Sequence, residues 1–500
     1  MLNNKRSNGV LFHPTSLPGN YGIGDFGHEA YLFVDKLKES GVGLWQTLPL
    51  GPTGYGNSPY ASRSSFAGNE LLISIDLLKE DGYLNDDDLL DMPAFSKAKV
   101  EYYKVELWKK PLLIKAAKRF IKMNTESEEF EKFQKENKYW LDDYCLFISI
   151  YEEYNDSRWY SVWDEKLRIR DEKTLDKKRI SNKEKIDCYR VLQYFFFKQW
   201  HRLKKYANDR DIKIVGDIPI FASGDSVDIW CHSDLVKTDA QGKFKAVSGC
   251  PPDGFTPLGQ LWGNPVYDWK RNEETGYEWW IDRIEHQLKM CDILRIDHFR
   301  GFESYWEIPF GAKDATNGVW TKGPGIKLFN AVSKKLGKVP LIAEDLGYMT
   351  DEVIKLRKDL NLPGMKIGVF GFDFNEDGSI NSDNIDFAYN YDEQCFAYPG
   401  THDNTPIQQW FSELTTAQKN SVCDCLATDY NNVHWAMIRD IYYSRANYAV
   451  VQIQDILGLS KEGRMNHPST CNDVNWSWRL NQPIDEEMKR LSRLIKYSKR

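Results

Sequence analysis

Residues 294–298 read Leu-Arg-Ile-Asp-His, residues 342–346 read Ile-Ala-Glu-Asp-Leu, and residues 400–404 read Gly-Thr-His-Asp-Asn. Each stretch places an acid just past a short apolar run, and these acids are Asp297, Glu344 and Asp403. An apolar run of this length is typical of a buried parallel strand. Because an α/β barrel keeps its active site at the carboxyl ends of its strands, the three stretches predict a barrel with three acids at one mouth.

Eight short β-like runs follow one another along the chain, and helical patterns separate several of them. The runs cover residues 9–13, 44–48, 212–217, 293–297, 340–344, 365–370, 395–398 and 448–454. Strands that alternate with helices predict a parallel sheet, and eight such units predict a closed barrel. We therefore expect an α/β protein with a (β/α)8 TIM barrel.

Two of the segments between the runs have a clear helical period. In residues 26–40 apolar side chains recur every three or four positions, and Gly41 follows as a stop signal. Residues 186–206 repeat the pattern more strongly, with Lys and Arg between the apolar positions.

The second and third runs are separated by far more chain than one helix needs. We expect residues of about 50–210 to form a largely helical insertion over the barrel mouth, and residues of about 230–275 to form a loop insertion after the third strand. Residues 1–500 would then form a single catalytic barrel. The alternative for the first insertion is a separate domain that is unrelated to the site.

Composition argues against several classes of partner. The net charge is −7 and no long block of Lys and Arg occurs, so we expect no nucleic-acid partner. No stretch approaches the ~18 apolar residues of a membrane helix, and no apolar segment of a signal peptide follows Lys5 and Arg6. The nine cysteines are scattered and odd in number. A reducing cytoplasm is therefore the simplest setting, without a membrane partner.

Asp297 and Arg295 are two positions apart in a predicted strand, so both side chains face the same side. If that side is the barrel interior, the guanidinium favours the ionised carboxylate, which is the form that a nucleophile needs. A purely structural Arg–Asp pair explains the motif equally well.

Glu344 and Asp217 also lie at predicted strand ends. Apolar surroundings or a nearby negative charge at Glu344 would keep its carboxyl protonated near neutral pH, as an acid catalyst requires. The alternative is that Glu344 or Asp345 caps the next helix. For Asp217 the alternative is a turn aspartate shortly before Pro219.

His402 precedes Asp403, which raises the possibilities of a metal site and of a Ser–His–Asp triad. Metal ligation needs further ligands at suitable spacing, and the nine histidines are mostly dispersed. Neither a Gly-x-Ser-x-Gly motif nor a Walker loop is present. We expect no metal and no organic cofactor. Three acids at one mouth fit a bond that needs protonation and nucleophilic attack together, and the glycosidic bond is the leading candidate.

Two loops rich in Gly and Pro carry aromatic residues. Residues 54–60 contain two tyrosines, and residues 249–267 contain Phe255 and Trp262. Rings on long loops often bind a ligand. The alternative is that these rings fold inward and pin the loops.

Taken together, these motifs resemble those of the 4-α-glucanotransferases of glycoside hydrolase family 77, the amylomaltases or disproportionating enzymes. Residues 216–221, 294–301, 343–347 and 400–404 match the four signature regions of that family in order. The resemblance extends from residues 9–18 to residues 475–479, nearly the whole chain. It implies a retaining enzyme that acts on α-1,4-glucans and maltooligosaccharides, with glucose as an acceptor.

The resemblance also implies residue roles. Asp297 would be the nucleophile, Glu344 the general acid/base and Asp403 the transition-state stabiliser. The residues implied to bind sugar are Tyr60, Asp217, Phe255, Trp262, Arg295, His402 and Asn475. One departure is Gly254, where the family often has a bulkier residue, and it bears on acceptor selectivity.

Two alternatives to a transferase follow from the same residues. An α-amylase-like hydrolase would share the three acids, and a non-catalytic glucan-binding protein would need aromatic rings without the acids. For a retaining mechanism, the carboxyl groups of Asp297 and Glu344 are expected to be about 5–5.5 Å apart.

Overall fold

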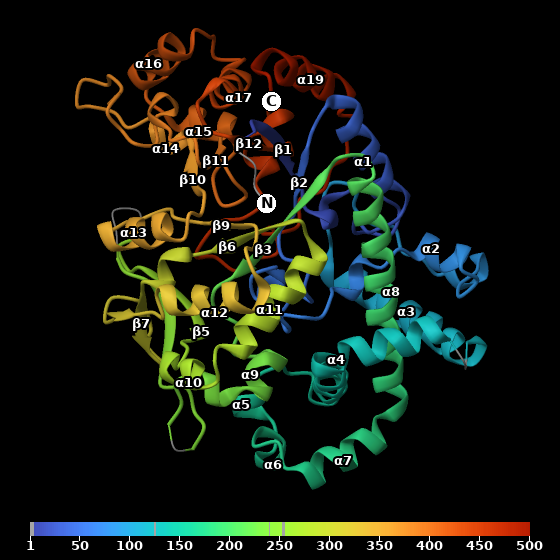
Figure 1. Cartoon of the computed structure of the whole chain (residues 1–500). Helices are drawn as coiled ribbons and strands as arrows, with labels where there is room; N and C mark the ends of the chain where they lie inside the picture. Colours follow the sequence, from blue (N-terminus) through green and yellow to red (C-terminus); the bar gives the residue numbers. More distant parts are fainter. Residues whose placement is uncertain (1–4, 125–126, 240, 253–255) are drawn as a thin grey trace.

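The chain forms an eight-stranded parallel barrel surrounded by helices (Figure 1). A computed structural model describes residues 5–124, 127–239, 241–252 and 256–500. The strands pair in the order β10-β11-β12-β1-β2-β3-β6-β9. Their bounds are β1 (Ser7–Leu11), β2 (Leu44–Gln46), β3 (Lys213–Pro219), β6 (Ile293–Asp297), β9 (Leu341–Ala343), β10 (Gly364–Ile367), β11 (Cys395–Tyr398) and β12 (Tyr448–Gln452).

Each of the eight predicted runs overlaps one of these strands, so the predicted barrel is confirmed. The ends differ by a few residues. The predicted run 365–370 stops at Ile367, where the short helix α14 (Gly368–Gly371) begins, and the run 448–454 ends in α18 (Ile453–Ile456). The strands are buried almost throughout, which explains why their sequences are continuously apolar rather than alternating.

The barrel is nearly closed between its two edge strands, β9 and β10. In this seam the backbone N–H of Ala343 donates to the carbonyl of Pro363 at 3.0 Å. The backbone N–H of Met365 donates to a carboxylate oxygen of Asp345 at 2.7 Å. A backbone bond and a side-chain bond therefore join this seam, whereas ladders of backbone bonds join the other neighbouring strands.

Helices pack outside the barrel and follow most of its strands. The predicted helix 26–40 is α1 (His28–Ser40), and Gly41 ends it with φ of 76°. The others are α9 (Val227–Cys231), α10 (Trp269–Glu274), α11 (Glu278–Met290), α12 (Ile326–Leu336), α13 (Asp351–Asp359), α15 (Ile407–Glu413), α16 (Thr416–Leu426), α17 (Val433–Tyr443) and α19 (Asp485–Ser498).

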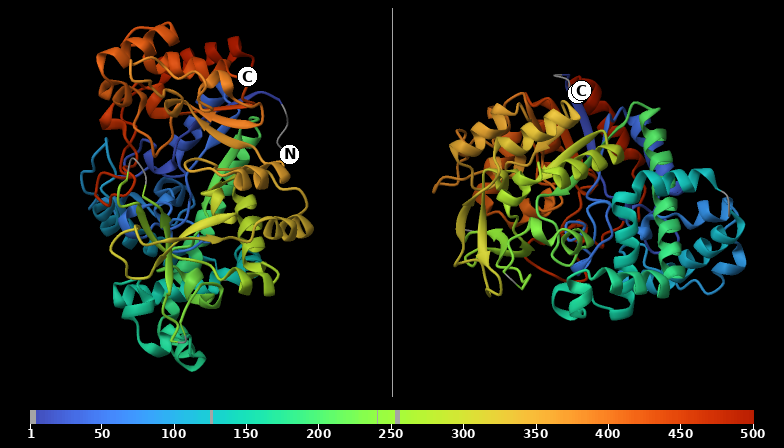
Figure 2. Two further views of the ribbon diagram at one scale, coloured as in Figure 1. Left: turned by 90° about the vertical axis from the view of Figure 1, so that its left-hand side faces the viewer. Right: turned by 60° about the horizontal axis from the view of Figure 1, so that its bottom comes forward.

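The chain between β2 and β3 is mostly helical, and its helices gather on one side of the molecule (Figure 2). They are α2 (Ile75–Glu80), α3 (Tyr102–Met123), α4 (Glu128–Tyr154), α5 (Trp159–Val162), α6 (Glu165–Arg168), α7 (Glu172–Ser181) and α8 (Lys183–Asn208). The predicted helix 186–206 lies within α8, which packs against α3, α4 and β3.

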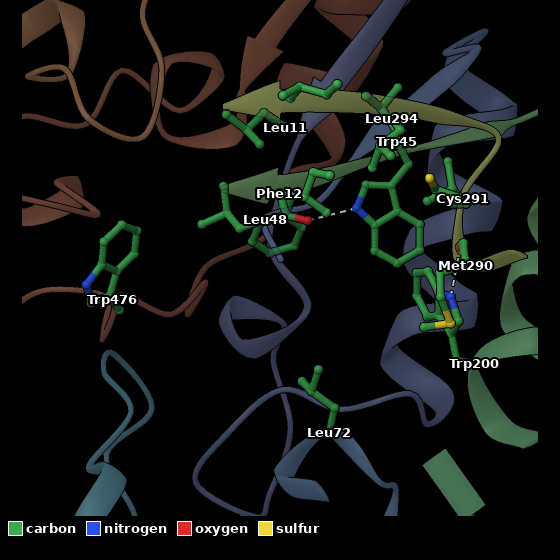
Figure 3. Packing of buried hydrophobic residues seen from close by; sticks show 14 of the residues in the cluster. Leu11, Phe12, Trp45, Leu48, Leu72, Trp200, Met290, Cys291, Leu294 and Trp476 are labelled. Carbon is green, nitrogen blue, oxygen red and sulfur yellow. Dashed lines mark hydrogen bonds between the residues drawn. The ribbon is translucent and has the colours of Figure 1, made fainter. Parts of the chain in front are cut away.

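Tryptophans tie α8 to the barrel core (Figure 3). Trp200 of α8 lies 6.4 Å from Trp45 of β2 between ring centroids, and both rings are fully buried. Each indole N–H has a backbone partner: Trp45 donates to the carbonyl of Phe12 at 2.8 Å, and Trp200 donates to that of Met290 at 2.9 Å. These bonds remove the penalty of burying two polar N–H groups.

A second, antiparallel sheet is built from the segments that follow β3 and β6. Its strand order is β5-β4-β7-β8, with β4 (Ala246–Cys250), β5 (Gln260–Pro265), β7 (Ser304–Pro309) and β8 (Val319–Lys322). Among the described residues, none of the helices combines the length and the apolar character that a membrane crossing requires.

Candidate active site

The acids singled out by sequence lie at the carboxyl ends of barrel strands. Asp297 is the last residue of β6, and Glu344 directly follows β9. The two are held side by side, because the N–H of Glu344 donates to the carbonyl of Ile296 at 3.0 Å and the N–H of Phe299 donates to that of Glu344 at 3.0 Å. Asp403 lies between β11 and α15, on the same side of the barrel.

Arg295 connects Asp297 to Asp217 inside the barrel. Its Nη1 donates to both carboxylate oxygens of Asp217 at 2.8 and 2.7 Å, and its Nη2 lies 3.0 Å from Oδ1 of Asp297. Arg295 and Asp217 are both buried. Burial alone would lower the pKa of Arg295, but the charges of Asp217 and Asp297 raise it well above its ordinary value. The guanidinium therefore remains charged beside Asp297.

Tyr60 extends this network toward Asp403. Its hydroxyl donates to Oδ2 of Asp217 at 2.8 Å and lies 2.9 Å from Nε2 of His402. Since that hydroxyl proton is directed at Asp217, the network assigns a proton to Nε2 of His402, which also lies 3.3 Å from Oδ2 of Asp403. The Tyr60 and His402 rings are nearly parallel, with centroids 5.4 Å apart.

His402 is almost completely buried and uncharged. Burial lowers the pKa of this imidazole, against the opposing effect of Asp403. As a neutral imidazole it lies beside the Asp403 carboxylate without neutralising it.

Glu344 has the environment of a general acid. Its carboxylate oxygens accept the backbone N–H groups of His298 at 2.6 Å and Leu346 at 2.9 Å. Burial, followed by the charge of Asp297, raises the pKa of Glu344 to about 7. The group is therefore partly protonated at neutral pH, the state that proton donation to a leaving oxygen requires.

Asp297 differs from Glu344 in its contact with a cation. Burial raises the pKa of Asp297, and the nearby guanidinium of Arg295 opposes this effect. The contacts of the Glu344 carboxylate are with backbone N–H groups. Of the two acids, Asp297 therefore ionises first, which separates a nucleophile from a proton donor.

Asp217 is bound in the same network. Burial raises the pKa of Asp217 to about 7, while Arg295 acts in the opposite direction. We consider the carboxylate ionised at neutral pH, because it accepts two charge-assisted bonds from Arg295 and one from Tyr60.

The structure also brings in two residues that the sequence did not reveal. Asn466 donates through Nδ2 to Oδ1 of Asp403 at 2.7 Å. The buried ring of Trp476 lies 5.9 Å from Tyr60 and 6.0 Å from His402 between centroids. Both come from irregular chain beyond β12, where no periodic pattern could have indicated them.

The remaining predicted sugar-binding residues are placed differently. The ring of Trp262, in β5, packs edge-to-face on the ring of His298, with the centroids 4.7 Å apart. His298 directly follows Asp297 in the chain. Asn475 is buried and braces a nearby loop, accepting from the N–H of His467 at 3.1 Å and donating to the carbonyl of Thr470 at 3.0 Å. Phe255 and the neighbouring Gly254 lie outside the described residues.

Comparison with known proteins identifies the family. The family model for 4-alpha-glucanotransferase, of glycoside hydrolase family 77, matches residues 12–485. A 4-alpha-glucanotransferase of Streptococcus pneumoniae serotype 4 is 46% identical over 481 residues, covering 96% of this chain and 94% of the relative. One from Clostridium butyricum is 44% identical over 478 residues, covering 94% of this chain and 96% of the relative.

A solved structure agrees with these matches. The amylomaltase from Streptococcus agalactiae in complex with acarbose superposes with a TM-score of 0.94 at 40% identity, covering 99% of this chain and 100% of the other. The chain therefore belongs to the 4-alpha-glucanotransferases of glycoside hydrolase family 77.

Proposed function

We propose that this enzyme moves α-1,4-glucan segments from a donor maltodextrin to the 4-hydroxyl of an acceptor glucan or of glucose, with retention of configuration. The observation that carries the proposal is the pairing of an ion-paired carboxylate, Asp297, with an adjacent acid of raised pKa, Glu344. The acarbose complex of the Streptococcus agalactiae relative supports a glucan-like ligand.

In the first step Glu344 protonates the glycosidic oxygen as Asp297 attacks the anomeric carbon. The bond between that carbon and the leaving oxygen breaks, and a covalent glycosyl-enzyme forms. Arg295 keeps Asp297 ionised until the attack and therefore acts as a positioning residue for the nucleophile.

In the second step Glu344 works as a base. Once Asp297 is esterified, its negative charge is gone and one cause of the raised pKa of Glu344 disappears. The glutamate is then better suited to remain ionised until it takes the proton of the incoming 4-hydroxyl, whose oxygen displaces Asp297 from the anomeric carbon. The same acid thus donates a proton and later accepts one.

The other site residues have the proposed roles that the resemblance to the family implies. Asp403, oriented by Asn466 and adjacent to His402, stabilises positive charge at the reacting sugar. Tyr60 stacks under that sugar. Arg295, Asp217 and His402 bind the hydroxyls of that sugar. Phe255 and Trp262 contact acceptor-side sugars. Asn475 contributes to sugar binding through its loop.

We also propose that the segment of about 50–210 forms an insertion over the barrel mouth, within a single catalytic unit of 500 residues. The hydrogen bond from Tyr60 to Asp217 supports this placement, because Tyr60 lies near the start of that segment. The scattered, odd-numbered cysteines support action in a reducing cytoplasm.

Incubation with maltotriose tests the proposal. Transfer yields glucose together with longer maltodextrins, which thin-layer chromatography separates. Reducing ends that rise without redistribution of chain length would instead identify a hydrolase, and unchanged maltotriose would leave a glucan-binding protein. The Asp297→Asn variant is the control, because its amide cannot attack as a carboxylate does.

A further inference from the structure

Two exposed aromatic rings that are not part of the acidic site lie next to each other. Trp320 of β8 exposes 41% of its surface, and Tyr348 in the segment between β9 and α13 exposes 69%. Their ring planes are within 24° of parallel, and the centroids are 6.3 Å apart. The elements next to them, β7 and α13, lie on the same side of the molecule (Figure 1). We call this pair the Trp320–Tyr348 platform.

The platform is held in place by Arg300. Its guanidinium lies 3.9 Å from the centroid of Trp320 and 5.6 Å from that of Tyr348. Nη1 of Arg300 also donates to the carbonyl of Tyr348, and Nη2 donates to Oγ of Ser304 at 3.1 Å. A further ring, Trp306, supports Trp320 edge-on at 5.3 Å. The two exposed rings are therefore fixed before any ligand arrives, which lowers the entropy cost of binding.

The platform is connected to the active site by short stretches of chain. Arg300 belongs to η6 (Phe299–Phe302), which begins just after Asp297, and Tyr348 is in the segment that follows Glu344. A chain spans at most ~3.3–3.6 Å per residue, so the backbone of Tyr348 is within about 14 Å of that of Glu344. Glu344 faces the leaving oxygen in the proposed mechanism, and this short connection is our reason for assigning the platform to the leaving chain and the acceptor.

Single exposed rings are ordinary on a protein surface and need no explanation. Tyr103 of α3, for example, is 77% exposed and belongs to the helices between β2 and β3. The platform differs because two nearly parallel rings are fixed by one buried cation beside a predicted sugar site. Flat apolar rings of this kind suit the apolar faces of glucose units.

We propose that the Trp320–Tyr348 platform binds the α-1,4-glucan chain of long acceptors and of long leaving segments, beyond the sugars that contact Trp262. This inference rests on the proposed function, since it assumes that an α-1,4-glucan enters the site. It assigns chain-length preference to two rings outside the catalytic machinery. Short substrates such as maltotriose would be cleaved and elongated without reaching them.

The test compares Tyr348→Ala and Trp320→Ala with the matched control Tyr103→Ala. We expect each platform variant to raise KM for amylose by about two- to tenfold, the range for losing one aromatic contact, with kcat unchanged. The kcat/KM for maltotriose should change by less than about twofold, and Trp320→Phe should restore most of the amylose affinity. Equal losses on both substrates, or no loss on amylose, would overturn the proposal.

A binding measurement separates this inference from the proposed function. Every variant, the control included, also carries Asp297→Asn, so that the glucan is not consumed, and migrates in native gels containing amylose. Loss of retardation in the platform variants alone supports the platform, whether or not the wild type transfers glucan. Equal retardation in all variants refutes it. If Trp320→Ala unfolds, Tyr348→Ala decides, because most of that side chain is already in solvent.

Discussion

The electrostatic interaction between Asp297 and Glu344 predicts how far the pKa of Glu344 shifts in the Asp297→Asn variant. At the spacing of a retaining pair, about 5–5.5 Å, and an effective dielectric constant of about 20, two unit charges interact by about 3 kcal/mol. One pKa unit corresponds to about 1.4 kcal/mol. The charge of Asp297 therefore accounts for up to about 2 units of the raised pKa of Glu344.

Removing that charge favours the ionised form of Glu344, so its pKa should fall. We expect it to move from about 7 toward about 5, with the rest of the elevation kept because burial is the first cause. Carboxyl 13C NMR of protein labelled at glutamate measures this value, and the resonance is assigned by its loss in Glu344→Gln.

Asp403→Asn is the matched control for this titration. The charge of Asp403 acts on Asp297, whereas the main charges that act on Glu344 are those of Asp297 and Arg295. We expect a markedly smaller shift in the control. A pKa of Glu344 that moves by less than about 0.5 units in Asp297→Asn would contradict the coupling on which the two-step mechanism depends.

Four further variants follow from the structure. Glu344→Gln should slow maltotriose cleavage by about 10²–10⁴, measured as glucose release. Tyr60→Phe keeps the ring but removes a hydroxyl with two partners, so kcat/KM should fall about tenfold. Asn466→Ala removes the amide that orients the predicted stabiliser, and kcat should fall about five- to tenfold with little change in KM. Trp200→Ala should lower the free energy of unfolding by about 3–5 kcal/mol in urea titrations.

For each of these four variants, one result would contradict the expected effect. An unchanged maltotriose rate would remove Glu344 as the acid. A wild-type rate in Tyr60→Phe would show that the ring alone matters. For Asn466, a change confined to KM would indicate sugar binding rather than orientation of a carboxylate. For Trp200, an unfolding midpoint equal to that of the wild type would show that this ring does not anchor α8.

The barrel was predictable because its strands are short apolar runs ending in polar groups. The same signal did not predict where the strands end. Residues 368–370 continue the apolar run but belong to α14. A short apolar run alone does not distinguish a strand from a helix. The antiparallel sheet was not anticipated. In β8 three of four residues are exposed, so its sequence lacks the buried alternation that marks a strand.

The site likewise contains residues whose contacts the sequence could predict and residues whose contacts it could not. Arg295 and Asp297 could be paired from sequence because strand side chains repeat every second residue, and the ion pair confirms that placement. Asn466 and Trp476 reach the site through irregular chain that folds back, and sequence spacing does not encode such a return. Asn475, implied by resemblance, has its described bonds within its own loop.

The seam between β9 and β10 constrains the neighbour of Glu344, the proposed proton donor. Asp345, the neighbour of Glu344, joins the two edges by accepting the N–H of Met365 and pairing with Arg357 at 2.8 Å. A Cβ on Gly364 would meet the Asp345 carboxylate at 2.4 Å, so even alanine there must displace it. Adding one methyl group at Gly364 would thus shift the Asp345 side chain, which directly follows Glu344, the proposed proton donor.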